Sequence, residues 1–438
     1  MAQAAADVRL YPGARIAIVG GGPSGSFAAL HLLRLARQRG MTISVTIFER
    51  KRFGLRGPAG CNKCAGILSV RVTRGLKELG LRIPESLVLS RLEGYILHLA
   101  GRAIPIARPD PSRTILSVYR GGGPLHGDLS PDVSFDEWLL TEACAAGAER
   151  IMASVRKISA GPLMEVETDL GRSSFHLVVL ASGVNTRPPV LEGLNYIAPE
   201  TEVMAMDELA LNTPLSAAQR RQAHVYIGRQ TGLIFGALLP KDNYLSLSLL
   251  GHGFAGDPVK AFLAREDCDW LDETGAMGLC GCRPKIATTP AHAFFGDRFV
   301  TVGDAGVTRL YKDGIGSAYQ TAWQAARTAF EIGISEQAFA RGYAPLCRSI
   351  ARDNRIGKLL FAPWEGRNPR LYDLWERCWL YVLLAEEQLA LRERRGHLAV
   401  WSLLTGDDTY WGILRNVLSL RIIAMLIAGS LVRRRPVA

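Results

Sequence analysis

The chain has 438 residues and a net charge of +11, with 48% apolar and 21% charged residues. A chain of this length can bury large cores in more than one structural unit, and its composition excludes disordered, collagen-like and fibrous proteins. The positive charge is uneven, because residues 409–438 contain five arginines and no acidic residue. This distribution favours a local partner surface, and we expect no nucleic-acid binding.

The eight cysteines are too few for a disulfide scaffold in a chain of this length. Residues 1–13 contain no apolar core of signal-peptide length. No stretch reaches the roughly 18 to 20 uncharged apolar residues that span a bilayer. We therefore expect a cytoplasmic protein, and the closely spaced cysteine pairs favour redox or metal chemistry over secretion.

Residues 15–49 predict a strand, a glycine turn, a helix and a second strand in direct succession. Residues 15–19 form a nearly continuous apolar run, which is typical of a strand buried on both faces of a parallel sheet. A helix is expected over residues 26–38, and residues 42–48 contain the β-branched residues of a second strand. This order is typical of a dinucleotide-binding unit.

The glycines of the first turn have the spacing that such a unit needs. Gly20, Gly22 and Gly25 fit G-x-G-x-x-G, in which one glycine forms the tight turn, one lets a pyrophosphate approach the backbone and one allows close helix packing. The helix N-terminus offers amide donors to the phosphates. Glu49 ends the second strand, where its carboxylate can accept both ribose hydroxyls.

A second strand-and-turn unit occurs late in the chain. The short apolar strand Phe299–Val302 ends in Gly303-Asp304-Ala305, and Lys312-Asp-Gly-Ile-Gly316 opens another helix. With this motif the chain resembles the FAD enzymes of the p-hydroxybenzoate hydroxylase and geranylgeranyl reductase superfamily. The segments Phe135-Asp-Glu-Trp-Leu139 and 178–187 match two further motifs of that superfamily in order, so the resemblance covers about residues 14–355.

The resemblance implies FAD as the cofactor. It implies that Asp304 accepts hydrogen bonds from the ribityl chain, and that the amides at the start of the late helix meet the pyrimidine end of the flavin and stabilise its reduced anion. The full set of implied FAD-binding residues is Gly20, Gly22, Pro23, Ser24, Gly25, Glu49, Arg50, Arg120, Val155, Gly303, Asp304, Gly314, Ile315 and Gly316.

Within the superfamily, Gly60-Cys-Asn-Lys-Cys-Ala-Gly66 looks most like the geranylgeranyl reductase branch, whose members carry a cysteine-glycine motif near the flavin. The branch's substrate motif P-x-x-Y-x-W-x-F-P falls on residues 232–240, where only Pro240 matches. The loop from Gly303 to Gly314 is also about two residues shorter than in the branch. The resemblance therefore predicts the flavin fold but does not identify the substrate.

The cysteines leave three alternatives open. Cys61 and Cys64 could form a catalytic or redox-active dithiol beside the flavin. Together with Cys280 and Cys282 they could supply four thiolates to zinc or an iron-sulfur cluster. They could also be small buried residues without a chemical role.

The expected fold class is α/β, with a Rossmann-like FAD-binding domain, an interleaved antiparallel-sheet substrate domain and a C-terminal helical region. The expected FAD-binding domain is discontinuous and the sheet lies over the flavin ring. The bounds are 14–90, 115–195 and 290–340 for the FAD-binding domain, 91–114 and 196–289 for the substrate sheet, and 341–438 for the helical region.

The tail has features of a membrane-surface segment. Five of the eight tryptophans fall in the last 75 residues, followed by an apolar segment interrupted by Arg415 and Arg421 and then by arginines 433–435. Aromatic residues at headgroup level and a terminal basic cluster suit a helix that lies on the inner face of the cell membrane. The alternative is a helical cap on the core.

The leading functional hypothesis is a reductase that saturates C=C bonds of a prenyl chain in a lipid or lipid precursor by hydride transfer from reduced FAD, with Cys64 as the proton donor or as a residue that shapes the pocket of the donor. An FAD-dependent monooxygenase, a hydroxylase or epoxidase of an apolar or aromatic substrate, is the first alternative, because the same fold supports both reactions. A flavin/dithiol electron-transfer protein is the second. NAD(P)H, ferredoxin and quinol are all candidate electron donors.

Overall fold

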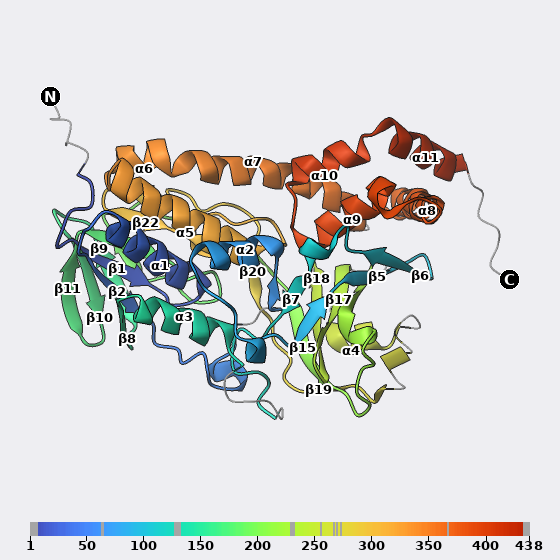
Figure 1. Ribbon diagram of the computed structural model, residues 1–438, viewed down its shortest axis with the longest axis horizontal. Helices are drawn as coiled ribbons and strands as arrows, with labels where there is room; N and C mark the ends of the chain where they lie inside the picture. Colours follow the sequence, from blue (N-terminus) through green and yellow to red (C-terminus); the bar gives the residue numbers. More distant parts are fainter. Residues whose placement is uncertain are drawn as a thin grey trace.

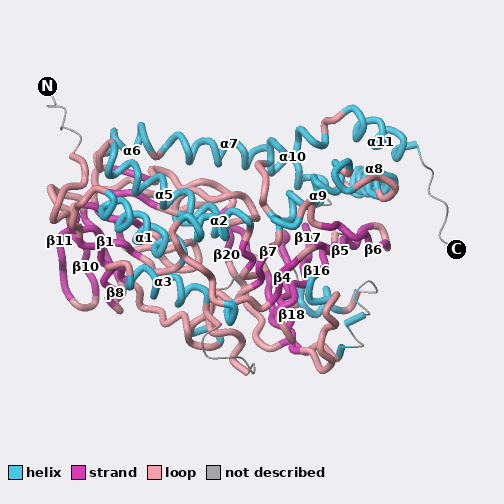
Figure 2. The backbone as a smooth tube through the Cα atoms, viewed as in Figure 1, coloured by secondary structure: helices cyan, strands magenta, loops and turns pink. Residues whose placement is uncertain are grey.

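The computed structural model describes residues 8–62, 65–126, 133–227, 233–254, 256–265, 268, 270–271, 274–365 and 368–431. A nucleotide-binding domain and a sheet domain lie side by side along the long axis, and C-terminal helices cross above both (Figure 1). Figure 2 shows the same arrangement by secondary structure, with the C-terminal helices above the strands of both domains and other helices beside the strands. This confirms the predicted α/β class with its Rossmann-like sheet, antiparallel sheets and C-terminal helical region.

A six-stranded sheet forms the centre of the nucleotide-binding domain, in the order β21-β22-β12-β1-β2-β8. Five of its strands are parallel, and β21 pairs antiparallel at one edge. The bounds are β1 Arg15–Val19, β2 Ser44–Phe48, β8 Ala148–Ile151, β12 Leu177–Leu180, β21 Phe295–Gly296 and β22 Phe299–Thr301.

Both faces of this sheet are covered, which explains why β1 is apolar at consecutive positions. Ile16 and Ile18 pack in a core with helices α1 and α5. Ala17 and Val19 pack in a second core with a small sheet of order β11-β10-β9-β13. The bounds are α1 Pro23–Gln38, α3 Phe135–Ala145, α5 Gly314–Glu331, β9 Val155–Ser159, β10 Met164–Thr168, β11 Gly171–Phe175 and β13 Val190–Glu192.

The sheet domain contains seven strands in the order β19-β15-β18-β17-β16-β5-β6. The expectation of an all-antiparallel sheet is wrong at one pair, because β16 runs parallel to β5 with His224 opposite Ile96. No hairpin joins these two strands, since the chain returns to the nucleotide-binding domain between them. The bounds are β5 Gly94–Leu99, β6 Arg102–Ala107, β15 Ala205–Ala210, β16 Gln222–Tyr226, β17 Leu233–Lys241, β18 Tyr244–Gly251 and β19 Met277–Gly278.

Short elements join the two domains. A three-stranded sheet of order β3-β7-β4 and a two-stranded pair, β14 with β20, lie between them. Ser69 caps helix α2 by accepting a hydrogen bond from the Val72 amide. The bounds are β3 Ile67–Leu68, β4 Ser90–Leu92, β7 Ile115–Ser117, β14 Thr201–Val203, β20 Lys285–Ala287, α2 Val70–Glu78 and α4 Pro258–Leu263.

The C-terminal helices begin beside α5 and end over the sheet domain (Figure 1). Trp401 of α9 is fully buried and contacts Tyr95 of β5, with ring centroids 5.5 Å apart. The fully buried Glu386 at the end of α8 accepts hydrogen bonds from the amides of Gly396 and His397, which fixes the start of α9. The bounds are α6 Glu336–Gly342, α7 Ala344–Phe361, α8 Pro369–Glu386, α9 Arg395–Thr405, α10 Tyr410–Val417 and α11 Leu420–Leu431.

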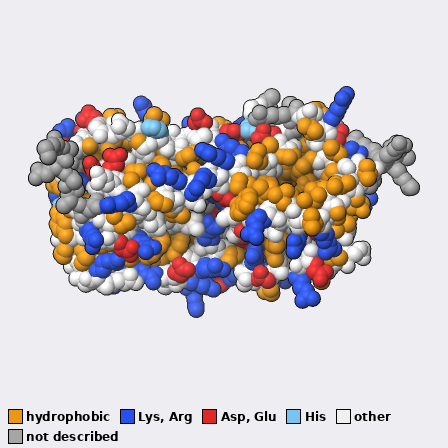
Figure 3. Space-filling view, turned by 90° about the horizontal axis from the view of Figure 1, so that it is seen from above, with side chains coloured by type: hydrophobic (Ala, Val, Ile, Leu, Met, Phe, Trp, Pro, Cys, Tyr) orange, Lys and Arg blue, Asp and Glu red, His pale blue; other side chains and the backbone are white. Residues whose placement is uncertain are grey.

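The last two described helices carry exposed apolar residues. Leu420 is 88% exposed, Leu431 77% and Ile427 59%. Seen from above, hydrophobic side chains gather over the α8, α10 and α11 end of the molecule (Figure 3). Among the described residues, no single helix is long and apolar enough to cross a bilayer, and α10 with α11 reaches that length only as a pair bent by 65°.

Candidate active site

The first glycine turn leaves an open backbone face at the start of α1. Gly20 has φ +106°, and a Cβ on Gly25 would lie 1.8 Å from the Gly20 carbonyl oxygen, so neither position accepts a side chain. A Cβ on Gly22 would instead meet only Arg120 and Asn62, each at 3.9 Å. No side chain caps α1, so the amides at Ser24 and Gly25 are available to an anion.

Glu49 connects the end of β2 to this turn. One carboxylate oxygen accepts a hydrogen bond from the Gly21 amide at 2.8 Å, and the other accepts one from the Lys51 amide at 2.8 Å. Each oxygen can accept a second hydrogen bond, so the carboxylate fits ribose hydroxyls. Arg50 is exposed, and Val155 is half-buried against the core that contains Val19 and Phe48.

Arg120 is fixed beside the glycine turn by a buried carboxylate. Its Nε and Nη2 donate to Asp136 at 3.0 and 2.8 Å, and the side chain of Asp136 is fully buried at the start of α3. Asn62 also donates to Asp136. The motif at residues 135–139 includes Asp136, but the sequence did not show that Asp136 holds Arg120. Asn62 was missed, although its position between Cys61 and Cys64 was a signal.

The second nucleotide motif contacts the first directly. Gly303 has φ +64°, and a Cβ there would lie 2.0 Å from the Ser24 Oγ, so only glycine permits this approach. Asp304 follows in a short turn, and its Oδ1 lies 3.5 Å from the position of a Cβ on Gly314. Burial raises the pKa of Asp304, while a hydrogen bond from Thr308 and the charge of Arg120 act against that rise.

The start of α5 is already partly capped. Asp313, with φ 56°, accepts a hydrogen bond from the Gly316 amide at 3.2 Å, so this amide is used within the chain. Three amides at the start of this helix were expected to meet the flavin, and those of Gly314 and Ile315 have no such cap. Ser69 donates to Asp313 at 2.7 Å, and burial raises the pKa of Asp313 to about 6.

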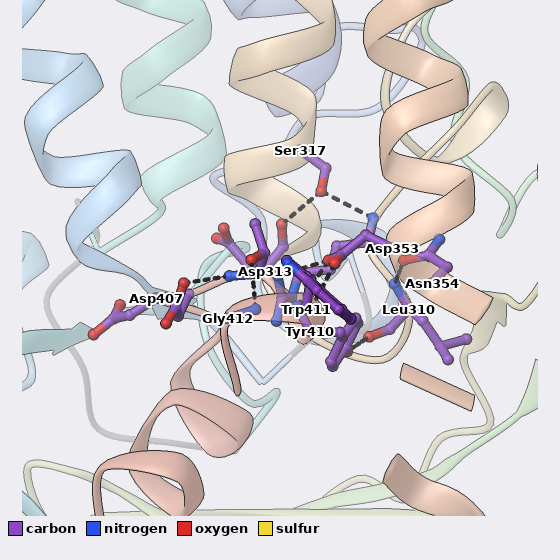
Figure 4. Close-up of polar contacts among 12 residues, drawn as sticks. Leu310, Asp313, Ser317, Asp353, Asn354, Asp407, Tyr410, Trp411 and Gly412 are labelled. Carbon is purple, nitrogen blue, oxygen red and sulfur yellow. Dashed lines mark hydrogen bonds and ion pairs between the residues drawn. The ribbon is translucent and has the colours of Figure 1, made fainter. Parts of the chain in front are cut away.

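The loop between Asp304 and α5 is held by the C-terminal helices (Figure 4). Asn354 of α7 accepts from the Leu310 amide at 2.9 Å and donates to the Thr308 carbonyl at 2.8 Å. Asp353 accepts from the Tyr410 amide at 2.9 Å, and the Tyr410 hydroxyl donates to the Leu310 carbonyl. The helical region therefore shapes one wall of the candidate flavin site.

Of the four predicted metal-binding cysteines, the structure describes Cys61, Cys280 and Cys282. Cys64 lies outside the described residues, and the described residues contain no group of three or more His, Cys, Asp or Glu that could hold a metal ion. Cys61 is half-buried, with its backbone packed against Gly121, where a Cβ would lie 2.7 Å from the Cys61 Cα. Burial raises the pKa of the Cys280 thiol to about 12, and Cys282 pairs with Met206 through backbone hydrogen bonds.

A buried polar cluster that the sequence did not reveal lies behind the cysteine loop. Lys241, fully buried at the end of β17, has its Nζ 3.4 Å from Glu208 and 4.2 Å from the Tyr119 ring. Ser246 and Tyr119 also donate to Glu208, at 2.6 and 3.2 Å. The same Nζ lies 3.5 Å from the position of a Cβ on Gly66, so the cluster supports this loop from the sheet side.

An apolar cavity of about 220 Å³ lies between the sheet and the C-terminal helices. Its lining is apolar throughout and includes Leu97 and Leu99 of β5 together with Trp364, Trp375 and Trp379. Leu359 also lines it and is 72% exposed, so the cavity reaches the surface there. A larger hollow of about 540 Å³ on β5 and β6 is lined partly by charged residues.

The smaller cavity adjoins the loop that leads to α5. Trp364 contacts Phe235 of β17 edge to face, with ring centroids 6.4 Å apart. Lys312, in the loop before α5, has its Nζ 3.9 Å from the centroid of the same Phe235 ring. The cavity and the loop before α5 therefore share Phe235, which contacts Trp364 on one side and Lys312 on the other.

Comparisons with known proteins agree with this arrangement. Residues 17–74 match the model of a family described as FAD-NAD(P)-binding. No curated protein sequence has a significant match to the chain. Among solved structures, a geranylgeranyl bacteriochlorophyll reductase-like protein from Thermoplasma acidophilum superposes with a TM-score of 0.65 and 14% identity, over 93% of this chain and 99% of that one.

Other flavin enzymes superpose comparably well. The p-nitrophenol 4-monooxygenase of Pseudomonas putida gives a TM-score of 0.60 at 13% identity, over 91% of this chain and all of that one. A halogenase variant in complex with FAD gives 0.59 at 13% identity, over 96% of this chain and 93% of that one.

The fold is therefore that of the FAD-dependent monooxygenases and oxidoreductases related to p-hydroxybenzoate hydroxylase. At 13–14% identity these likenesses define the fold but not the reaction. The open glycine turn, the uncapped start of α1 and the Glu49 carboxylate fit the pyrophosphate and ribose of FAD.

Proposed function

We propose that the protein is an FAD-dependent oxidoreductase that reduces C=C bonds in a prenyl-type chain. The observation that carries the proposal is the cavity of about 220 Å³, which has an apolar lining and adjoins the loop before α5. An unfunctionalised hydrocarbon chain offers no hydrogen-bonding group, so an apolar pocket suits such a chain better than it suits a polar substrate. When bound, FAD supplies the hydride for such a reduction.

The described residues have separate tasks in this proposal. The turn at Gly22 and the N-terminus of α1 bind the pyrophosphate, and Arg120 is held beside them by Asp136. The aromatic wall of Trp364 and Phe235 positions the chain and excludes water. Because an isolated alkene is weakly polarised, positioning has to supply most of the barrier reduction.

An FAD-dependent monooxygenase of an apolar substrate is the second candidate. It is favoured by the comparable superposition on p-nitrophenol 4-monooxygenase, with a TM-score of 0.60 against 0.65 for the reductase-like protein, because the names of these two enzymes describe different reactions. The two candidates differ in oxygen use, because a monooxygenase consumes oxygen together with substrate and a reductase does not. A flavin/dithiol electron-transfer protein is a third hypothesis, and electron flow that is unchanged in a Cys61→Ser variant would count against it.

The test is an anaerobic spectrum of the purified protein, reduced chemically and then mixed with a geranylgeranyl lipid. We expect the oxidised flavin bands to return without oxygen. Flavin that stays reduced until oxygen is admitted would reject the reductase and favour the monooxygenase, and protein that binds no flavin would reject both. The same assay, started with NAD(P)H, reduced ferredoxin or quinol, identifies the electron donor.

A cavity-filling variant sharpens the test. Ala399, 2% exposed, lines the cavity, so Ala399→Leu adds volume where the chain would lie. We expect this variant to reoxidise at least about tenfold more slowly with the lipid but normally with oxygen, since small acceptors need no cavity. Ala390→Leu, at an exposed position outside the cavity, is the matched control.

We also propose that the α8, α10 and α11 surface binds the inner face of an anionic membrane. Exposed Leu420 and Leu431 provide apolar area, and Arg415 and Arg421 are exposed beside them. Arginines 433–435 lie outside the described residues. Cosedimentation with vesicles that contain anionic lipid, but weaker cosedimentation of a Leu420→Ser variant, is the expected result, whereas a salt-stable dimer with no vesicle binding would reject the proposal.

A further inference from the structure

Lys312 stands where the three parts of the molecule meet. It precedes Asp313, the residue that caps α5, and its Nζ lies 3.9 Å from the centroid of the Phe235 ring in the sheet domain. From the C-terminal helices, Gly406 at the end of α9 lies so near that a Cβ there would be 3.4 Å from the Lys312 Cβ. The half-buried side chain therefore lies between the flavin loop, β17 and the helical region.

No described residue gives the Lys312 ammonium an anionic partner or a hydrogen-bond acceptor. Burial alone lowers the pKa of Lys312 to about 7, and no charged neighbour contributes to that shift.

The charged and titratable groups around the loop already have partners of their own. They are Asp313, which accepts from Ser69 and pairs with Arg71; Arg309, which pairs with Asp353 and stacks on Tyr410; and Asp407, which accepts from the Trp401 indole.

An ammonium on a half-buried side chain without an anionic partner is unfavourable unless something else at the site stabilises its charge. Lys312 lies two residues before Gly314, where α5 begins. A helix N-terminus favours an anion, so an anion bound at the amides of Gly314 and Ile315 would also stabilise the Lys312 ammonium. An oxidised flavin ring is neutral, whereas the reduced form bound near neutral pH is negatively charged. The charge that would pair with Lys312 is therefore present in only one redox state.

We propose that Lys312 is a proton-carrying residue whose protonation follows the redox state of the cofactor. It binds a proton at Nζ when the site is reduced and releases that proton when the site is reoxidised. This rests on the proposed function, since it requires FAD beside the start of α5. Saturating one C=C bond takes two electrons and two protons: one proton and the electron pair arrive as the hydride that FAD supplies, and the other proton leaves Nζ, whose N–H bond breaks as the second C–H bond forms.

The test is the pH dependence of the midpoint potential of the bound FAD, measured anaerobically between about pH 6 and 9.5. Each proton taken up with the electron pair changes the equilibrium tenfold per pH unit, which is about 30 mV for a two-electron couple. Above about pH 7 we expect two protons, and hence about 60 mV per pH unit, in the natural protein. In Lys312→Met and Lys312→Arg we expect one proton and about 30 mV per unit, since neither side chain titrates in this range.

The control is Lys260→Met, which removes an exposed lysine of α4 and should leave the slope of the natural protein unchanged. Lys312→Arg retains a positive charge, so it answers the question even if Lys312→Met folds poorly. Equal slopes in all four proteins would overturn the role of Lys312 and leave the proposed function standing. Absence of bound FAD from the natural protein would overturn both.

Discussion

The half-buried Lys312 ammonium, which has no anionic partner among the described residues, predicts that a neutral side chain at this position makes the oxidised protein more stable. Lysine in an unfolded chain has a pKa of about 10.4, whereas burial lowers the pKa of Lys312 to about 7. Between these values the unfolded state binds more protons than the folded state, so the lysine opposes folding and its unfavourable effect shrinks as the pH rises. A methionine keeps the apolar stem and removes this effect.

The size of the effect follows from the pKa difference. Each unit corresponds to about 1.4 kcal/mol, so Lys312→Met should raise the free energy of unfolding by at most about 4 kcal/mol near pH 7 and about 2 kcal/mol near pH 9. Any packing contribution of the methionine is independent of pH and does not alter the difference between the two conditions. Partial relaxation of the folded chain around the ammonium would reduce both values together.

The measurement is urea denaturation of the oxidised protein near pH 7 and near pH 9, followed by flavin and tryptophan fluorescence. As the pH rises, the free energy of unfolding of the natural protein should approach that of Lys312→Met. Lys260→Met should show no such pH-dependent gap, because this side chain is exposed. A Lys312→Met variant that is less stable at both pH values, or a stability gap that does not change with pH, would refute the reasoning.

Three further predictions concern the cofactor site. Gly25→Ala places a Cβ 1.8 Å from the Gly20 carbonyl oxygen and should weaken FAD binding at least about tenfold by equilibrium dialysis, whereas Gly54→Ala, whose Cβ would have an ordinary contact with Glu137 at 3.9 Å, should not. Arg120→Met leaves the fully buried Asp136 without its cation, so the free energy of unfolding in urea should fall by about 3 kcal/mol or more. Asp353→Ala removes the acceptor of two backbone amides, so the free energy of unfolding, measured by thermal denaturation, should fall by about 2 kcal/mol and FAD should be released faster. An unchanged rate of FAD release would mean that the C-terminal helices do not support the loop before α5.

The sequence was informative wherever a function depends on local spacing. The strand, turn and helix around Gly20–Gly25 could be predicted because the pattern lies within 35 consecutive residues. The predicted fold class, with its parallel Rossmann-like sheet and C-terminal helices, is confirmed for the same reason, since each part has its own hydrophobic pattern. The Gly303 motif was also visible, but not the approach of its backbone to Ser24, which only the folded chain brings about.

Features built from distant segments could not be predicted. Lys241 and Glu208 read as ordinary strand residues, and only the pairing of β15, β17 and β18 places them beside Tyr119 of another domain. The tryptophans of the tail were assigned to a membrane surface, yet Trp364 and Trp401 are buried, because the hydrophobic pattern of a helix does not reveal which neighbour covers it. Lys312 was quoted only as part of a glycine turn, since nothing in its sequence shows that Phe235 contacts it.

The parallel pairing of β5 with β16 restricts the order in which the chain can fold. Until residue 226 has left the ribosome, β5 can pair only with β6, and the intervening chain must first add β8 and β12 to the other sheet. The nucleotide-binding sheet in turn receives β22 only after the whole sheet domain has been made. Neither domain is a continuous piece that could be expressed alone, and the long-range strand pairings of both domains imply slow refolding.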